Sequence, residues 1–186
     1  MLRELRKNEM KNLLAIGVIL LGLVVLGACG SAPSIKPEDV IVGNTIPDFS
    51  LKSLEGKTID KNSLKGEVVV LNFWASWCTP CMAEIPELKE LAANSKAKVL
   101  GIALDESGLE TIRPFVEAHK INYTVLVGDQ DIFQQFNGAG IPYTLVLDRT
   151  QRIVKIYRGP TDRASLEADL KTIQQGSETQ LSRAGQ

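Results

Sequence analysis

Two cysteines, Cys78 and Cys81, are the residues whose type and spacing most directly indicate chemistry in this sequence. They stand in Trp77-Cys78-Thr79-Pro80-Cys81, after an apolar stretch and before residues with helical spacing. Residues three apart at the start of a helix lie on one face, and disulfide-bonded cysteines have Cα atoms about 5.5 Å apart. The pair is therefore expected to form a disulfide without movement of the backbone.

The start of a helix also predicts which cysteine reacts first. Unpaired backbone N–H groups and the positive end of the helix dipole stabilise a thiolate at Cys78, so its pKa is expected to lie below the usual value of about 8.5. Pro80 is compatible with this position because the first helical turn has no N–H bond to lose. We expect Cys78 to attack a partner disulfide and the less exposed Cys81 to resolve the mixed disulfide.

The same pair has two other interpretations, an inert structural disulfide and half of a metal site. Zinc normally requires four Cys, His or carboxylate ligands, and outside the pair the chain offers His119 and Cys29. We therefore favour redox activity and predict neither a metal nor a cofactor. His119 is predicted to be a packing or surface histidine, on the apolar face of its helix. Asp105, Glu106 and Asp129 are predicted to be loop and cap residues.

The elements that must position the pair follow from apolar patterning. Apolar runs or alternation predict strands at residues 48–51, 57–60, 68–75, 98–104, 123–127, 143–147 and 152–157. Helical spacing predicts helices at residues 78–94, 111–119, 131–136 and 162–174, the second starting near residue 111 because of Pro114. Alternating strands and helices that end in a hairpin predict an α/β fold, with a mixed central sheet flanked by helices on both faces.

Composition and the N-terminal segment bound the rest of the chain. At 186 residues, with 21 basic and 22 acidic side chains, it suits one domain without a field that attracts nucleic acid. A basic leader precedes an uncharged apolar run at residues 13–28, too short for the about 20 residues of a spanning helix. We predict a signal peptide at 1–28, a flexible tether at 29–44, the domain at 45–175 and a polar tail at 176–186.

Several motifs in order resemble the thioredoxin superfamily, in particular its TlpA-like and ResA-like membrane-tethered branch. The resemblance covers about residues 44–174. Its motifs are Gly43-Asn44-Thr45-Ile46-Pro47-Asp48-Phe49, Val70-Leu71-Asn72-Phe73-Trp74-Ala75, the Cys-x-Pro-Cys pair, Glu84-x-Pro86 and Gly140-Ile141-Pro142. It implies a thioredoxin fold with an N-terminal β-hairpin and a β–α insertion.

The resemblance also implies how a partner is held. Pro142 aligns with a cis-proline that faces the cysteines and leaves the backbone of Ile141 free to pair with an extended substrate segment. Together with Trp77, Thr79 and Pro80, these residues are the expected substrate-binding surface. Tyr143 departs from the branch, where Thr or Ser is more usual, and its phenol is expected to narrow the docking groove.

Glu84 carries the third role that the resemblance implies. Common thioredoxins have a buried Asp in the central strand, but Asn72 stands at that position and cannot titrate. A Glu three residues after the second cysteine is present in the TlpA-like branch. We predict that Glu84 is partly buried with a raised pKa and exchanges protons with Cys81. A surface carboxylate without a catalytic role is the alternative.

Leu26-Gly27-Ala28-Cys29 resembles the lipobox of bacterial lipoproteins, which implies lipidation of Cys29 after cleavage. An uncleaved anchor helix is the alternative, and both place the domain on the extracytoplasmic side of a membrane in the cell envelope. The expected partners are exported proteins with disulfides, apocytochrome c among them, and a membrane electron donor. The expected activity is thiol-disulfide exchange as a reductant, although the motif does not fix the direction of electron flow.

Two other functions compete with thiol-disulfide exchange. Peroxiredoxins share the fold, but their Pro-x-x-x-Thr-x-x-Cys pattern would require Pro and Thr where Leu71 and Ala75 stand. A non-catalytic module that binds copper or another protein is the second alternative. Copper sites of that type need a wider cysteine spacing and a partnering His, which are not evident in the sequence.

Overall fold

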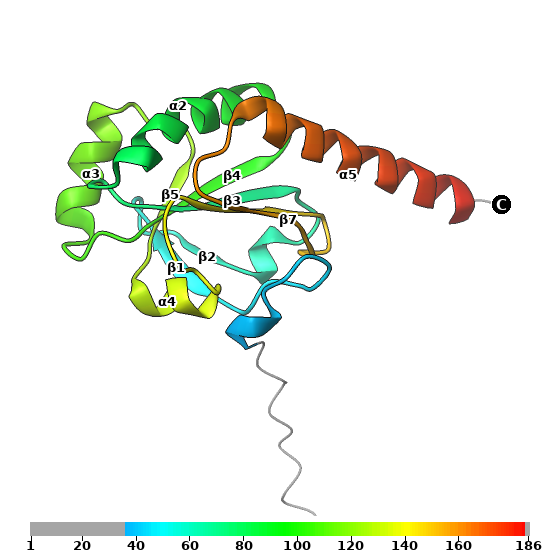
Figure 1. Ribbon diagram of the computed structural model, residues 1–186, viewed down its shortest axis with the longest axis horizontal. Helices are drawn as coiled ribbons and strands as arrows, with labels where there is room; N and C mark the ends of the chain where they lie inside the picture. Colours follow the sequence, from blue (N-terminus) through cyan, green and yellow to red (C-terminus); the bar gives the residue numbers. More distant parts are fainter. Residues whose placement is uncertain (1–35, 185–186) are drawn as a thin grey trace, which may run out of the picture. The chain divides into compact units, whose positions relative to one another are not determined.

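A computed structural model describes residues 36–184, in which one seven-stranded sheet forms the centre of the domain (Figure 1). The strand order is β2-β1-β5-β4-β3-β6-β7. The strands are β1 (Ser50–Ser53), β2 (Thr58–Asp60), β3 (Val69–Trp74), β4 (Lys98–Ala103), β5 (Thr124–Val127), β6 (Tyr143–Leu147) and β7 (Ile153–Arg158). The helices are α2 (Thr79–Asn94), α3 (Leu109–Ala118), α4 (Gln130–Gln135) and α5 (Arg163–Ala184), with short 3-10 helices η1 (Pro37–Asp39) and η2 (Asn62–Leu64).

Strand β3 leads directly to the cysteines and is buried along its whole length. It runs parallel to β4 and antiparallel to β6, so the sheet is mixed as predicted. Asn72 in its middle lies opposite Gly101 of β4 and Thr144 of β6. A strand enclosed by neighbours and by both layers reads as a continuous apolar run, which is why the sequence located it.

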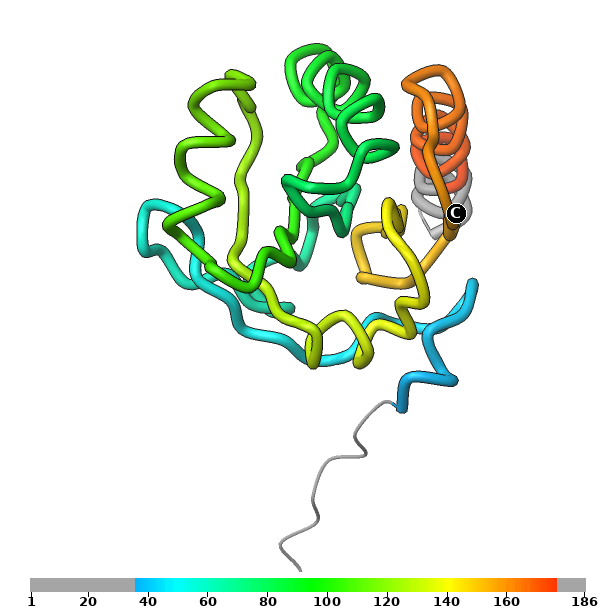
Figure 2. Tube along the Cα trace, turned by 60° about the vertical axis from the view of Figure 1, so that its left-hand side comes forward, coloured from blue at the N-terminus to red at the C-terminus, as the bar shows by residue number. Residues whose placement is uncertain are grey.

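Alternate residues of the strands serve two apolar cores, one on each face of the sheet. Helices α2, α3 and α5 cover the first face, where side chains such as Val70 and Trp74 point. Figure 2 shows these three helices side by side. Helices α4 and η2, together with Val40 after η1, cover the other face, where Leu71 and Phe73 point. The predicted arrangement of a mixed sheet with helices on both faces is confirmed.

The folded chain begins earlier than predicted. Val40 is completely buried in the core on the α4 face. The backbone N–H of Gly43 donates to the carbonyl of Ile153 at 2.8 Å, and Thr45 forms a bridge with Arg152. The prediction of a flexible tether up to residue 44 is therefore wrong from Pro37 onward, because this segment pairs with the start of β7. Residues 1–35, including the predicted signal peptide and Cys29, lie outside the described residues.

Two helices extend beyond their predicted limits. Gly108, with a φ of 55°, is the N-cap residue of α3, and the N–H of Ile112 donates to its carbonyl at 3.0 Å. Pro114 therefore lies inside α3, where it removes one helical hydrogen bond. Helix α5 runs to Ala184 through the predicted polar tail, since Gly176 is the one strong helix breaker in a stretch otherwise of tolerated residues. Among residues 36–184, no helix has the length and apolarity to cross a membrane.

Gly101 is required where β4 passes beneath the aromatic side chains of the first face. A Cβ atom at this position would lie 2.7 Å from the indole nitrogen of Trp74 and 3.1 Å from the ring of Tyr123. Both side chains are buried, so neither has space to move aside. We predict that Gly101→Ala lowers the free energy of unfolding by about 1 to 3 kcal/mol, as overpacking does, in urea denaturation of the oxidised protein.

The matched control is Gly176→Ala, which makes the same change where a Cβ atom meets no atom within 4 Å. Because this glycine lies within α5, alanine is expected to stabilise the protein by up to about 1 kcal/mol. Equal effects of the two substitutions would contradict the close packing at Gly101.

Candidate active site

The two cysteines form a disulfide at the point where β3 gives way to α2. Their Cα atoms are 5.3 Å apart. Cys78 is the N-cap residue of the helix, and its sulfur accepts a hydrogen bond from the backbone N–H of Cys81 at 3.2 Å. The N–H of Cys78 itself donates to the carbonyl of Ala75 at 3.1 Å, which closes the turn. The sulfur of Cys78 thus takes the position of the oxygen of a conventional capping side chain.

Both cysteines are largely covered in the disulfide form. Cys78 is 4% exposed and Cys81 is 1% exposed. Around them Trp77 is 68% exposed, and Thr79 and Pro80 are exposed as well. A partner therefore reaches the sulfur of Cys78 only by close contact with these three neighbours.

The segment before β6 lies at the same end of the sheet as the disulfide. Tyr143 is opposite Phe73, so Pro142 lies level with the end of β3, four residues before Cys78. The Ile141-Pro142 peptide bond is cis, and Pro142 is buried while Ile141 is partly exposed. Ile141 precedes the first residue of β6, so its backbone stands outside the ladder of that strand.

Tyr143 does not approach the disulfide, contrary to the sequence prediction. Its side chain is completely buried in the core on the opposite face, and its hydroxyl donates to the carbonyl of Phe136 at 3.0 Å. The guanidinium of Arg158 lies 5.0 Å from the centre of its ring. Side chains alternate along β6, so Thr144 faces α2 and Tyr143 faces away. The expectation that this phenol narrows the docking groove is therefore wrong.

Glu84 is buried beneath the disulfide side of α2, with 2% of its surface exposed. Its carboxylate accepts hydrogen bonds from the amide of Asn72 at 3.3 Å and from the hydroxyl of Thr144 at 3.2 Å. Burial raises the pKa of Glu84 from 4.5 to about 7, against the opposing effect of these bonds and of the backbone N–H of Thr161. A carboxyl with such a pKa changes protonation near neutral pH.

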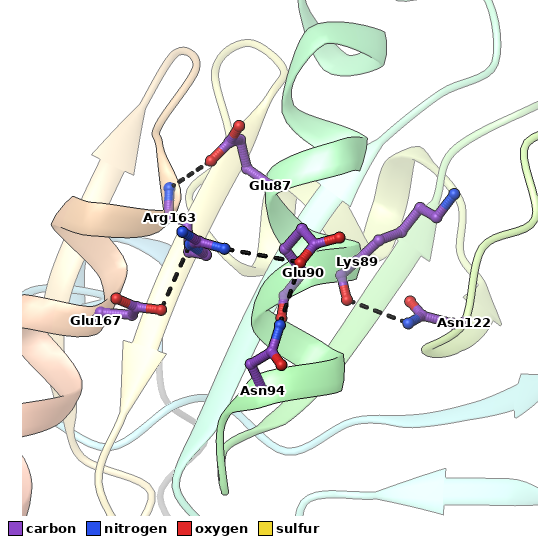
Figure 3. Close-up of polar contacts among 7 residues, drawn as sticks. All are labelled: Glu87, Lys89, Glu90, Asn94, Asn122, Arg163 and Glu167. Atoms are coloured by element: carbon purple, nitrogen blue, oxygen red, sulfur yellow. Dashed lines mark hydrogen bonds and ion pairs between the residues drawn. The ribbon is translucent and has the colours of Figure 1, made fainter.

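Arg163, at the start of α5, is joined by polar contacts to glutamates of α2 (Figure 3). The backbone N–H of Arg163 donates to the carboxylate of Glu87 at 3.1 Å. Its guanidinium pairs with Glu90 at 3.7 Å and with Glu167 at 3.5 Å. Thr161, two residues before Arg163, is thereby held where its backbone contacts Glu84.

Asp105 holds the loop that precedes the cysteines, although the sequence predicted only a loop or cap residue. Its side chain, 5% exposed, accepts hydrogen bonds from the backbone N–H of Ser76 at 3.1 and 3.3 Å and from the Ser76 hydroxyl. The available signal was an aspartate two residues after the end of β4, the strand parallel to β3. Asp129 does cap a helix as predicted, because its carboxylate accepts from the N–H of Ile132 at 2.8 Å.

His119 lies at the C-terminal end of α3 and is exposed, as predicted for a packing or surface histidine. Its ring stacks on Phe115 with centroids 3.9 Å apart. In the part of the chain that the structure describes, no three His, Cys, Asp or Glu side chains gather in a group able to hold a metal ion.

Comparison with known proteins agrees with this geometry. The family model described as AhpC/TSA family matches residues 42–167. The thiol-disulfide oxidoreductase ResA of Bacillus thuringiensis subsp. konkukian is 30% identical over 88% of this chain and 98% of its own length. The thioredoxin-like protein YneN of Bacillus subtilis is 31% identical over 69% of this chain and 78% of its own.

Among solved structures, a thiol:disulfide interchange protein of the thioredoxin family from Chlorobium tepidum TLS superposes with a TM-score of 0.62. It is 28% identical, and the match covers 72% of this chain and 97% of that one. The fold and the Cys-x-x-Cys pair are thus those of thioredoxin-like thiol-disulfide exchange proteins.

The raised pKa of Glu84 predicts a pH-dependent stability. The folded protein holds this proton more tightly than the unfolded chain, so stability falls as the pH rises from about 4.5 to about 7, by about 3 kcal/mol in all. Glu84→Gln carries no charge to bury. We expect it to match the wild type near pH 4.5 and to exceed it by up to about 3 kcal/mol at pH 8, in urea denaturation of the oxidised form.

Glu90→Gln, on the exposed side of the same helix, is the control and should keep the slope of the wild type between these pH values. The same slope in Glu84→Gln would show that Glu84 does not carry the effect.

Proposed function

Because this chain belongs to the AhpC/TSA family and is a thiol-disulfide oxidoreductase, we propose that it serves as a reductant of disulfides in exported proteins. The observation that carries this proposal is the sulfur of Cys78 at the N-cap of α2, bonded to Cys81 one turn further along. The structure shows the oxidised form of the protein, in which Cys78 and Cys81 are joined by a disulfide. In the reduced form, the attacking thiolate of Cys78 would lie at the positive end of the α2 dipole.

The reaction proceeds by two exchanges. The Cys78 thiolate attacks one sulfur of the partner disulfide, so that this bond breaks, a mixed disulfide forms and the first partner sulfur leaves as a thiolate that takes up a proton. Cys81 then loses its proton and attacks the sulfur of Cys78. The partner leaves as a dithiol, two electrons have passed to it, and the Cys78–Cys81 disulfide remains. A thiol-based electron donor at the membrane restores the dithiol.

Glu84 is the proposed acceptor of the Cys81 proton. It follows Cys81 by three residues on α2, and both side chains are buried on the side of the helix that faces the sheet. A pKa of about 7 lets the carboxyl accept a proton in one step and release it in the next near neutral pH. Asn72 and Thr144 fix its orientation through their hydrogen bonds.

The proposed docking surface consists of Trp77, Thr79, Pro80, Ile141 and Pro142. An extended segment of the partner would lie between the exposed Trp77 side of the loop and the Ile141-Pro142 segment at the same end of the sheet. The backbone of Ile141, outside the β6 ladder, would pair with it as a further strand does. Such pairing accepts many sequences, which suits a reductant of several exported proteins, with apocytochrome c among the expected partners.

The proposed setting is the extracytoplasmic side of a bacterial membrane. The sequence of residues 1–28 supports export, and Cys29 after Leu26-Gly27-Ala28 supports attachment through lipid. In that organisation residues 29–36 form the tether, and the domain begins at Pro37. Peroxide reduction is disfavoured, because Leu71 and Ala75 occupy the positions of the required Pro and Thr and both are completely buried.

A reduction potential measured on the soluble domain tests the direction of electron flow. We expect a value near that of thioredoxin, about −270 mV, and a value near that of DsbA, about −120 mV, would reverse the assignment. In extracts of the extracytoplasmic compartment, Cys81→Ser should accumulate mixed disulfides with partner proteins, because the resolving thiol is missing. Dithiothreitol should release these partners. Cys78→Ser is the control and should trap none, and equal trapping by both variants would contradict the assigned order of attack.

Glu84→Gln tests the proton transfer. We expect the second exchange, followed as decay of a mixed disulfide between Cys78 and a model peptide, to slow at least tenfold at pH 7. The inflection of this rate near pH 7 should disappear with the carboxyl. An unchanged rate and pH profile would remove Glu84 from the mechanism.

A further inference from the structure

Asp105 is a buried carboxylate next to the reactive loop that the exchange mechanism leaves without a role. It lies two residues after the end of β4, and the backbone N–H of the intervening residue, Leu104, donates to the carbonyl of Trp74 at 2.9 Å. The ladder between β3 and β4 therefore continues past both strands. This continuation brings Asp105 level with Ser76, two residues before Cys78.

The contacts of Asp105 are those of an ionised acceptor. Both donors of Ser76, its backbone N–H and its hydroxyl, point at the carboxylate oxygens. The Asp105 carbonyl also accepts from the N–H of Gly108 at 2.9 Å, which fixes the following turn. Among the side chains that the structure describes, those of residues 36–176, no ion pair includes Asp105, so none of their cations lies within 4 Å of its carboxylate.

This charge lies at the segment that leads into the cysteines, because Asp105 accepts hydrogen bonds from Ser76. Two consecutive Cα–Cα steps of 3.8 Å place the Cα atom of Cys78 within about 7.6 Å of the Cα atom of Ser76, whose N–H and hydroxyl donate to Asp105. Like charges repel more strongly inside a protein than in water, so a carboxylate held at this segment disfavours a thiolate at Cys78. The dipole of α2 stabilises a thiolate at Cys78, whereas the negative charge of Asp105, bonded to Ser76 before Cys78, destabilises that thiolate.

We propose that Asp105 is a positioning residue that fixes the Ser76 turn and whose charge makes the dithiol more reducing. The inference rests on the proposed role of Cys78 as the attacking thiolate. A thiolate exists only in the reduced protein, so a nearby carboxylate destabilises the reduced form relative to the disulfide. The protein then gives up its electrons more readily, which deepens the assignment as a reductant. Glu84 and Tyr123 are further ionisable groups buried on the α2 side of the sheet, and Glu84 is proposed to act through Cys81.

Asp105→Asn tests the inference, because the amide oxygen still accepts from Ser76 while the charge is gone. Two quantities are measured, the pKa of Cys78 from the pH dependence of alkylation and the equilibrium constant for oxidation by glutathione disulfide. We expect the thiol to ionise three- to tenfold more readily and the equilibrium constant for oxidation to fall at least threefold. Asp105→Ser, neutral and smaller, is the second variant, and either one that folds, as judged by circular dichroism, decides the matter.

Glu106→Gln is the matched control. It removes the same charge from the neighbouring residue, whose side chain is exposed. Both quantities should stay within twofold of the wild type. Values within twofold for a folded Asp105 variant would overturn the inference, as would an equal change in Glu106→Gln. A wild type that fails to exchange with glutathione would instead refute the proposed function, so the two failures are distinguishable.

Discussion

The hydrogen bond between the N–H of Cys81 and the sulfur of Cys78, at the first turn of α2, is the interaction on which the rest of this domain depends. Cys78 takes the N-cap position because β3 ends at Trp74 and the turn closed by Ala75 delivers the chain there. The strand is fixed by a parallel neighbour, an antiparallel neighbour and two cores, so the cap cannot drift relative to the Ile141-Pro142 segment. A reactive group set by a buried strand is held more rigidly than one set by a loop alone, and thiol exchange requires such fixed sulfur geometry.

The buried carboxyl of Glu84 costs stability when it ionises, and its proposed role in proton transfer would account for that cost. A methyl-bearing side chain in the same place would pack against Asn72 and Thr144 without a charge to desolvate. The protein instead keeps an ionisable group that is 2% exposed, with three donors that only partly compensate for the loss of water. Placing Asn72 on the neighbouring strand supplies a donor while keeping a second carboxylate out of the same cavity. One titrating group rather than two therefore serves this side of the cysteines.

Much of this arrangement was predictable from the sequence, where local patterns or motifs carried it. The continuous apolar run located β3, and the Cys-x-Pro-Cys pair after it located the cap. Burial of Glu84 followed from resemblance and not from periodicity. Tyr143 was misplaced because a motif position was taken as proximity, whereas the alternation of β6 turns the phenol to the opposite face. Asp105 was missed because its partner, Ser76, lies 29 residues away, and an aspartate just past the end of a strand does not by itself identify the loop to which it bonds.

The segment from Pro37 to Thr45 determines how the domain is presented. Gly43 bonds to Ile153, which lies opposite Leu147, and Leu147 lies opposite Val69 at the start of β3. The chain therefore joins the domain at the end of the sheet farthest from Cys78, one full strand length away. If the chain is anchored through its N-terminus, the attachment point lies at the opposite end of the sheet from the disulfide. The anchor therefore does not obstruct the disulfide. Partner polypeptides would then approach the cysteines without obstruction by the anchor. The anchoring segment would set only how far the domain can move from its attachment point.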